Sequence, residues 1–352
     1  MRRLLFLLTL LPGLSWAQKS VQVDGPYVRY EGQQRIVKTI WQDDDDLVVK
    51  TEHGALNVVP EGHPEWAFQV KLHTIGSENA AQPLAEKTLF MSDIEGEFAK
   101  FRKLLLAAQV IDSAYNWTYG HGSLVIAGDL FDRGKDVVPE LWLLYKLEDD
   151  AAAAGGSVHV LLGNHDVMNL SGDYRYTDAK YFKHAWFLNT GCAGLFGADT
   201  ELGRWLRSKN IIEKIGNVLV MHGGLSPALK GLTLDEVNKK YQPYGQQVKV
   251  DRNAPFWYRG YFRAPKISMA GVDSTLAAYS CKYIVVGHTI IKWNIASFYE
   301  GKIIGVDVDE HKGKPMAALL ENGQWFTIDD TGERKRLQYK PSNDQINEKD
   351  IL

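Results

Sequence analysis

The sequence predicts an α/β protein whose buried strands carry polar residues at their carboxyl ends. Five short apolar runs rich in Val, Ile, Leu and Met each precede a polar segment, and such runs are typical of buried strands. Helical spacing of apolar residues follows two of these segments, over residues 98–108 and 137–147. Open sheets with helical crossovers bind ligands at the carboxyl edge of their strands. We therefore expect one sheet edge to gather the five polar segments, which are residues 92–96, 128–134, 163–166, 222–224 and 287–289.

Length and composition are those of one large core, or of one core with appendages. The chain has 352 residues, of which 45% are hydrophobic and 24% charged. The formal net charge is -3. Because there is no basic excess, we expect no nucleic-acid partner.

Residues 1–17 have the pattern of a secretion signal. Arg2 and Arg3 precede an apolar stretch over residues 4–14, and the small residues Ser15 and Ala17 favour cleavage after Ala17. The alternative, a membrane anchor, is disfavoured because a bilayer span needs about 20 apolar residues. We expect a mature protein that is periplasmic or secreted and has no membrane partner.

Residues 18–86 contain no catalytic motif. Alternating apolar residues in this part predict a small N-terminal β appendage on the core. Residues 87–337 form the expected catalytic domain. Within it, residues 169–210 lack a strand pattern and are rich in aromatic residues. We expect a helical insertion there, whose rings either pack in the core or cover the site as a lid.

The end of the chain predicts a last core strand and then a hairpin. The strand is expected at residues 302–308, and Asn322-Gly323 predicts a tight turn between two further strands. Residues 338–352 form a polar tail.

The sequence does not decide whether Cys192 and Cys281 form a disulfide. An exported protein meets an oxidising compartment, where a bridge can form. However, Cys192 lies in a glycine-rich turn, Cys281 precedes an apolar run, and no pattern brings the two together. Both a bridge and two inert thiols are consistent with the sequence.

The polar segments supply the ligands that a pair of divalent metal ions needs. Asp129 is the expected bridge, because its strand lies between two other ligand-bearing strands. Such ions lie about 3.5–4 Å apart and lower the pKa of a shared water, so that hydroxide attacks phosphorus. Asn164, His222 and His288 supply oxygen and nitrogen donors for a borderline metal.

The other metal, here called the first metal, is expected in a harder site around Asp93, to which Glu95 or Glu97 also contributes. The metals themselves stay open among Mn, Zn, Fe, Mg and Ca.

Three further residues have chemistry suited to a phosphate ester. The planar guanidinium of Arg133 can hold two phosphate oxygens. His165 is expected to point away from the metals and to protonate the leaving oxygen, while Asp132 fixes its tautomer. In isolation, His165 would be interpreted as structural and Asp132 as a capping residue. Their place among the metal segments favours the catalytic interpretation.

These segments resemble the calcineurin-like metallophosphoesterase superfamily, and within it the phosphoprotein phosphatases. The family pattern Gly-Asp-x-His-Gly, Gly-Asp-x-x-Asp-Arg-Gly, Gly-Asn-His-Asp/Glu, His-Gly-Gly and a late histidine is followed in order between about Leu89 and Asp307, except at the first histidine. Residues 256–261 resemble the segment with a second phosphate-binding arginine, here Arg259. With this segment, the chain is most similar to the Shewanella-like branch, which is typified by a cold-active protein-tyrosine phosphatase.

The resemblance implies a four-layer metallophosphoesterase fold, in which helices flank a central β-sandwich. It implies a metal-bridging hydroxide that hydrolyses a phosphomonoester, with a preference for phosphotyrosine. The implied partners are a phosphorylated protein or peptide, or a small aryl phosphate. Neither cysteine lies in a Cys-x5-Arg phosphate loop, which agrees with a reaction that uses no cysteine nucleophile.

Glu95 stands where the family has histidine. It either binds the first metal through oxygen, hydrogen-bonds only a metal water, or leaves that site weak. Alternative functions on this scaffold are a broad phosphomonoesterase, a serine/threonine phosphatase and a nucleoside polyphosphate hydrolase. A different class is an exported metal-binding protein that has lost catalysis. Intact Asp132, Arg133, His165 and Arg259 favour an enzyme, because metal binding alone needs no acid and no phosphate clamps.

Overall fold

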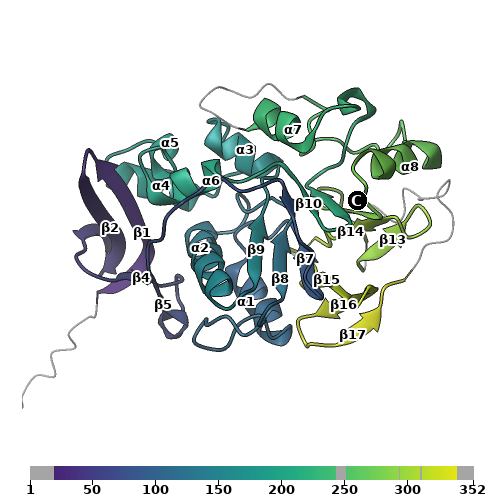
Figure 1. Cartoon of the computed structure of the whole chain (residues 1–352). Helices are drawn as coiled ribbons and strands as arrows, with labels where there is room; N and C mark the ends of the chain where they lie inside the picture. Colours follow the sequence, from purple (N-terminus) through teal and green to yellow (C-terminus); the bar gives the residue numbers. More distant parts are fainter. Residues whose placement is uncertain (1–19, 243–250, 293, 310, 339–352) are drawn as a thin grey trace, which may run out of the picture.

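The computed structural model describes residues 20–242, 251–292, 294–309 and 311–338 (Figure 1). The expected signal peptide lies outside the described residues, and so does the tail beyond residue 338. Two six-stranded sheets form the centre of the molecule. The first contains, in spatial order, β17 (Arg334–Arg336), β16 (Gln324–Asp329), β15 (Met316–Glu321), β7 (Lys87–Met91), β8 (Ser123–Ile126) and β9 (Ser157–Val160). The second contains β13 (Ala296–Phe298), β14 (Ile303–Gly305), β12 (Tyr283–Val286), β11 (Val218–Met221), β10 (Ile212–Ile215) and β6 (Ala81–Gln82).

The two sheets pack face to face through alternate residues of their strands. Phe90 of β7 and Val125 of β8 share a buried apolar cluster with Val220, Val285 and Ile304 of the second sheet. Successive side chains of a strand point to opposite faces. The neighbours of these residues along each strand therefore belong to a second apolar cluster, which the helices complete. This arrangement confirms the predicted β-sandwich.

Helices cover both outer faces of the sandwich and give the four layers. On the first sheet lie α1 (Phe98–Ala107) and α2 (Val137–Ala153), and α2 contacts β9. On the second sheet, α7 (Leu234–Tyr241) contacts β10, and Figure 1 shows α8 (Met269–Ala278) beside β13 and β14. Both helices predicted from apolar spacing are present. None of the described helices is long and apolar enough to cross a membrane.

The N-terminal region forms a separate small sheet of β1 (Val21–Glu31), β2 (Gln34–Asp43) and β3 (Asp46–Thr51), at the left of Figure 1. A second pair, β4 (Leu56–Val58) and β5 (Phe68–Val70), follows with the short helix η1 (Pro64–Trp66) between its strands. Strand β6 then pairs with β10 of the sandwich. The main sheets thus include residues that precede the expected domain start at residue 87.

The expected insertion at residues 169–210 is helical. After α3 (Asn164–Leu170) it contains α4 (Ala179–Phe187), α5 (Cys192–Leu195) and α6 (Glu201–Arg207). Some of its rings pack in the core and others are exposed. Tyr181 and Trp205 are buried, whereas Tyr176, Phe182 and Trp186 are exposed.

Near the C-terminus, the hairpin is confirmed and the strand before it is shorter than predicted. Strands β15 and β16 pair around Asn322-Gly323. Strand β14 contains only Ile303–Gly305, because the chain then leaves the second sheet to reach β15 in the first. Cys192 and Cys281 are both free thiols.

Candidate active site

All five polar segments meet at one end of the sandwich, but they do not share one sheet. Strands β7, β8 and β9 are parallel neighbours in the first sheet, and β11 and β12 are parallel neighbours in the second. The expectation of a single sheet edge was therefore wrong. The carboxyl ends of two facing sheets form the site, because the sheets pack closely and their loops approach from both sides.

Glycines allow these loops to approach closely. A Cβ atom on Gly163 would overlap the Asp129 carboxylate, and one on Gly287 would overlap Ser92 and Asp93. Many proposed site residues have left-handed backbones, with φ of 54° at Asp93, 59° at Asp129 and 64° at His288. Such conformations are costly for residues other than glycine and are concentrated at functional sites.

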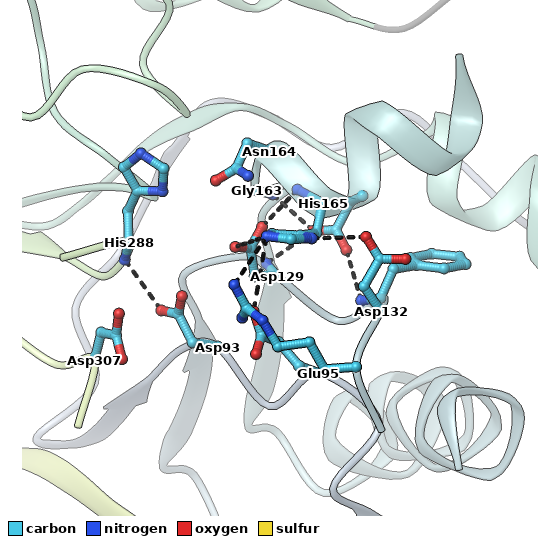
Figure 2. A network of polar contacts seen from close by, with 12 residues as sticks. Asp93, Glu95, Asp129, Asp132, Gly163, Asn164, His165, His288 and Asp307 are labelled. Carbon is cyan, nitrogen blue, oxygen red and sulfur yellow. Dashed lines mark hydrogen bonds and ion pairs between the residues drawn. The ribbon is translucent and has the colours of Figure 1, made fainter. Parts of the chain in front are cut away.

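Asp129 lies at the centre of the cluster, as expected for a bridging ligand. Its Oδ2 lies 3.0 Å from Nε2 of His222, and its Oδ1 accepts the backbone N–H of His165 at 2.8 Å. Strand β8 lies between β7 and β9, so Asp129 is placed between the loops of Asp93 and Asn164 (Figure 2).

His222 presents a nitrogen to this oxygen cluster. Its Nδ1 donates to the carbonyl of Ala127 at 2.8 Å, while Nε2 lies 3.0 Å from Asn164 Oδ1. Burial alone would lower the pKa of His222, but the carboxylates of Asp129 and Asp93 outweigh it and raise the pKa to about 9. A cation at Nε2 would satisfy the same carboxylates without a proton.

His288 completes a group of possible metal ligands with Asp129 and His222. Ligand atoms of Asp129, His222 and His288 all lie within 4.8 Å of one another. Nε2 of His288 is buried and has no hydrogen-bond partner among the described residues. Burial, and then the positive charges of His222 and Arg259, hold the pKa of His288 well below its usual value. A neutral, buried and unpartnered imidazole nitrogen is well suited to a metal.

Carboxylates dominate the other half of the cluster. Glu95, Asp129 and His165 form a second group with ligand atoms within 4.8 Å. Asp93 accepts from Ser92 Oγ at 2.5 Å and from the His288 backbone N–H at 3.1 Å. Burial raises its pKa, and the nearby Asp129 adds to this effect. Glu95 lines the cavity, whereas Glu97 is not among its lining residues.

His165 and Asp132 form the expected pair. Nδ1 of His165 donates to Asp132 Oδ2 at 2.6 Å. Asp132 Oδ1 also accepts from Asn169 Nδ2 at 2.7 Å and Thr177 Oγ1 at 2.8 Å, so the carboxylate is held in place.

The expectation that His165 points away from the metals was wrong. Its Nε2 lies 4.0 Å from Asp129 Oδ2 and 3.9 Å from Glu95 Oε1. With Nδ1 held by Asp132, the other ring nitrogen necessarily faces the cavity. Burial would lower the pKa of His165, but Asp129 and Asp132 outweigh it and raise the pKa.

Both expected arginines reach the same cavity, whose volume is about 380 Å³. Arg133 contacts Glu95 and lies 3.3 Å from Nε2 of His165, and its side chain is half exposed. Arg259 contacts the carbonyl of His288 and lies 3.3 Å from Thr289 Oγ1. The two guanidinium groups thus reach the cavity from different parts of the chain, Arg133 from the loop between β8 and α2 and Arg259 from the segment that precedes α8.

Comparison with known proteins identifies the family. Residues 86–292 match the calcineurin-like phosphoesterase family. The chain belongs to that family. This phosphoesterase is similar to Shewanella-like protein phosphatase 2 of Arabidopsis thaliana, with 27% identity over 282 residues, which cover 65% of this chain and 72% of that protein.

A solved structure and a bacterial relative extend the comparison. The crystal structure of the cold-active protein-tyrosine phosphatase of a psychrophilic Shewanella species matches with a TM-score of 0.80 and 35% identity, over 90% of this chain and 99% of that one. The symmetrical bis(5'-nucleosyl)-tetraphosphatase of Buchnera aphidicola is 32% identical over 146 residues, which cover 40% of this chain and 45% of that protein.

The donor set of the phosphoesterase fits the divalent metals that this family uses. Imidazole nitrogens, an amide oxygen and several carboxylates converge on Asp129, and this mixture suits Zn, Fe or Mn. The sequence predicts that Asp93, Glu95, Asp129, Asn164, His222 and His288 would hold the metals. Of these, Glu95, Asp129, His222 and His288 belong to the two groups of converging ligand atoms, and the second group also contains His165.

Two carboxylates of the phosphoesterase site are not among the residues predicted from the sequence. Asp307 is buried beside Asp93, and burial together with Asp93 raises its pKa well above the usual value (Figure 2). It follows the short strand β14 without a recognisable motif, so only its place after an apolar run could have indicated it. Asp166 was noted within a motif but given no role.

Asp166 shapes the loop that carries Asp129. Its carboxylate accepts backbone N–H groups of Asp129 at 2.9 Å, Leu130 at 2.8 Å and Gly163 at 2.7 Å. The phosphoesterase therefore holds its two central loops together through one buried side chain.

Proposed function

We propose that this phosphoesterase is a metal-dependent phosphomonoesterase that prefers phosphotyrosine in proteins or peptides, and that also accepts small aryl phosphates. The observation that carries this proposal is an exposed tyrosine beside the pair of His165 and Asp132. The ring centroid of Tyr176 lies 5.2 Å from that of His165, and half of the Tyr176 residue is exposed. An aryl leaving group at His165 could stack on this ring.

The loops around the cavity supply the groups that bind the phosphate and protonate the leaving oxygen. When bound, the divalent metals would supply Lewis-acid activation of water and neutralise phosphate charge. Arg133 and Arg259 orient the phosphate oxygens from two sides. His165 gives the proton on Nε2 to the leaving oxygen, while Asp132 keeps the other proton on Nδ1. A phenolic oxygen is less basic than an alkoxide and needs less help from this acid.

A basic cleft beside the cavity favours a protein or peptide over a small ester. The cleft has a volume of about 870 Å³ and shares Arg259 and Arg263 with the active-site cavity. Arg252 and Lys266 also line it. Its positive charge suits acidic residues on either side of a phosphorylated tyrosine.

Substitution of Tyr176 tests the aryl preference. Tyr176→Ala should raise the Michaelis constant for a phosphotyrosine peptide and leave that for a phosphoserine peptide nearly unchanged. Tyr176→Phe, which keeps the ring, should behave like the wild type. Trp186→Ala is the matched control, because Trp186 is exposed on the same insertion and its described ring contact is with Phe187. Equal effects of Tyr176→Ala on both peptides would contradict the preference.

A nucleoside polyphosphate hydrolase is the second candidate, and the similarity to the tetraphosphatase of Buchnera aphidicola favours it. The same assay with diadenosine tetraphosphate, a serine phosphopeptide and p-nitrophenyl phosphate, each with Mn²⁺, Zn²⁺ or Mg²⁺, separates the candidates. A higher kcat/KM for the dinucleotide than for the tyrosine phosphopeptide would replace the first proposal with the second.

We also propose that the mature protein is exported to the periplasm or secreted after cleavage behind Ala17. The charged start and the short apolar stretch of residues 1–17 support this. Expression of the full chain in a bacterium, followed by fractionation and mass spectrometry, should show a periplasmic or secreted protein that begins at Gln18. An uncleaved protein in the cytoplasm would contradict export.

A further inference from the structure

His311 comes from a distant segment and lies against the first metal motif. Its Nε2 lies 2.5 Å from Glu95 Oε2, and its Nδ1 lies 2.9 Å from Glu97 Oε1. The segment is the connection from β14 in the second sheet to β15 in the first, which also carries Asp307. The connection crosses between the sheets beside the site, and Glu95, Asp307 and His311 all line the cavity.

The pattern of contacts is that of a metal-binding histidine. A ligating histidine usually donates one ring N–H to a carboxylate, which fixes the tautomer and directs the other nitrogen at the metal. Glu97 is placed to accept from Nδ1 of His311, and the remaining nitrogen points at Glu95. Glu95 is buried, whereas about a quarter of the His311 side chain is exposed, so His311 closes the solvent side of the cluster.

The first metal site otherwise has few nitrogen donors. Asp93, Glu95 and Asp129 offer only oxygen, and His165 has one ring nitrogen committed to Asp132. Glu95 occupies the position at which the family motif has an imidazole. His311 places an imidazole next to that glutamate from the connection between the two sheets.

We propose that His311 is a ligand of the metal held by Asp93, Glu95 and Asp129, and that Glu97 orients it. This inference rests on the proposed metal-dependent function. It also changes the expected metal preference of the site. Oxygen donors alone favour hard ions such as Mg²⁺ or Ca²⁺, whereas an added imidazole favours Zn²⁺, Fe²⁺ or Mn²⁺.

Metal titration of the full chain tests this without an activity readout. The metal-free protein is titrated calorimetrically with Zn²⁺ and, separately, with Mg²⁺. In the wild type, we expect two Zn²⁺ sites. In His311→Ala, one site should bind Zn²⁺ about 100-fold more weakly or more, since loss of even an outer-shell partner costs about 10–100-fold. The affinity for Mg²⁺ should change much less. Glu97→Gln should lower the affinity for Zn²⁺ about 10-fold.

His63→Ala is the matched control. His63 also contacts a glutamate, with Nδ1 3.0 Å from Glu65 Oε1, but it lies in the N-terminal region and is exposed. This variant should bind Zn²⁺ at both sites with the dissociation constants of the wild type. Far-UV circular dichroism and thermal unfolding of the metal-free variants confirm that each has folded.

Two results would overturn the assignment. The first is that both Zn²⁺ dissociation constants stay unchanged in His311→Ala. The second is full recovery of Zn²⁺ affinity in His311→Gln, whose amide can hydrogen-bond Glu95 but is a poor substitute for an imidazole ligand. Failure of the proposed function looks different, because the wild type would then bind two metals with His311 among the ligands yet hydrolyse none of the phosphate esters.

Discussion

The two ring nitrogens of His165 have different surroundings, and this difference defines the chemistry of the side chain. Nδ1 is held by Asp132, and Nε2 faces the cavity. His165→Asn should lower turnover of a phosphoserine peptide by about 10²–10⁴, with both metals retained. The loss should be smaller for p-nitrophenyl phosphate, whose leaving group hardly needs a proton. Equal losses on both substrates would exclude the acid role, and loss of metal would make His165 a ligand.

The raised pKa of His165 predicts how activity depends on pH. Its raised pKa keeps the imidazolium present to higher pH, so activity that needs the acid should fall as pH rises through that value. Asp132→Asn removes one of the carboxylates that raise the pKa. The basic limb of the profile of kcat against pH should therefore move to lower pH. An unchanged basic limb would show that another group controls it.

The sequence predicted most residues of the site but not their long-range contacts. Asp129, Asn164, His222 and His288 each follow an apolar run, and this local pattern locates them. The contact of Glu95 with His311 joins residues 216 positions apart, and nothing near either residue indicates it. Tyr176 belongs to the aromatic insertion at residues 169–210, but its contact with His165 depends on tertiary packing that no local pattern predicts.

At the scale of elements, a buried polar cluster fixes the N-terminal sheet to the insertion. Asp24 of β1 accepts from Nδ1 of His184 on α4 at 2.6 Å and from Tyr27 at 2.7 Å, and Lys180 Nζ lies 3.9 Å away. Burial would raise the pKa of Asp24, but Lys180 and His184 outweigh it and lower the pKa. Both strands and helices of this region were predicted, but a polar contact between them leaves no local pattern.

Removal of Asp24 should therefore loosen this region. Asp24→Ala leaves His184 without its buried carboxylate partner and removes one of the three carboxylates around Lys180, where Glu61 and Asp136 remain. It should reduce the free energy of unfolding by about 3–5 kcal/mol near neutral pH. Because the folded pKa is lowered, the contribution of Asp24 is present above its unfolded pKa and is lost as pH falls through the folded value. Urea unfolding at several pH values measures both effects. Asp45→Ala, in the exposed turn after β2, is the control and should change stability by less than about 0.5 kcal/mol. Equal effects of the two substitutions would contradict this role.

At the scale of the whole molecule, two sheets concentrate negative charge where they meet. Asp93, Asp129 and Asp307 are buried together, and burial with mutual repulsion raises the pKa of Asp93 and Asp307. Bound cations relieve this repulsion, so metal should stabilise the fold. A metal at 1,000 times its dissociation constant adds about 4 kcal/mol by linkage. Thermal unfolding with a chelator and with excess Mn²⁺ should show a clear rise in Tm with metal, and an unchanged Tm would contradict the metal site.

The sequence could not predict which strands share a sheet, and the reason is physical. Buried strands of both sheets have the same apolar composition, so their runs do not reveal which sheet each joins. The segments were thus predicted to meet, but on one sheet edge rather than between two.

The metal dependence of turnover in the wild type and in Asp129→Asn tests whether Asp129 bridges two catalytic metals. A neutral amide keeps the size of the side chain but cannot join two metals as a carboxylate does. Metal-free wild-type protein should hydrolyse a phosphotyrosine peptide only after a divalent metal is added back, and Asp129→Asn should stay nearly inactive under the same conditions. More than a few per cent of wild-type turnover in Asp129→Asn, with a full complement of metal, would contradict a bridging role for Asp129.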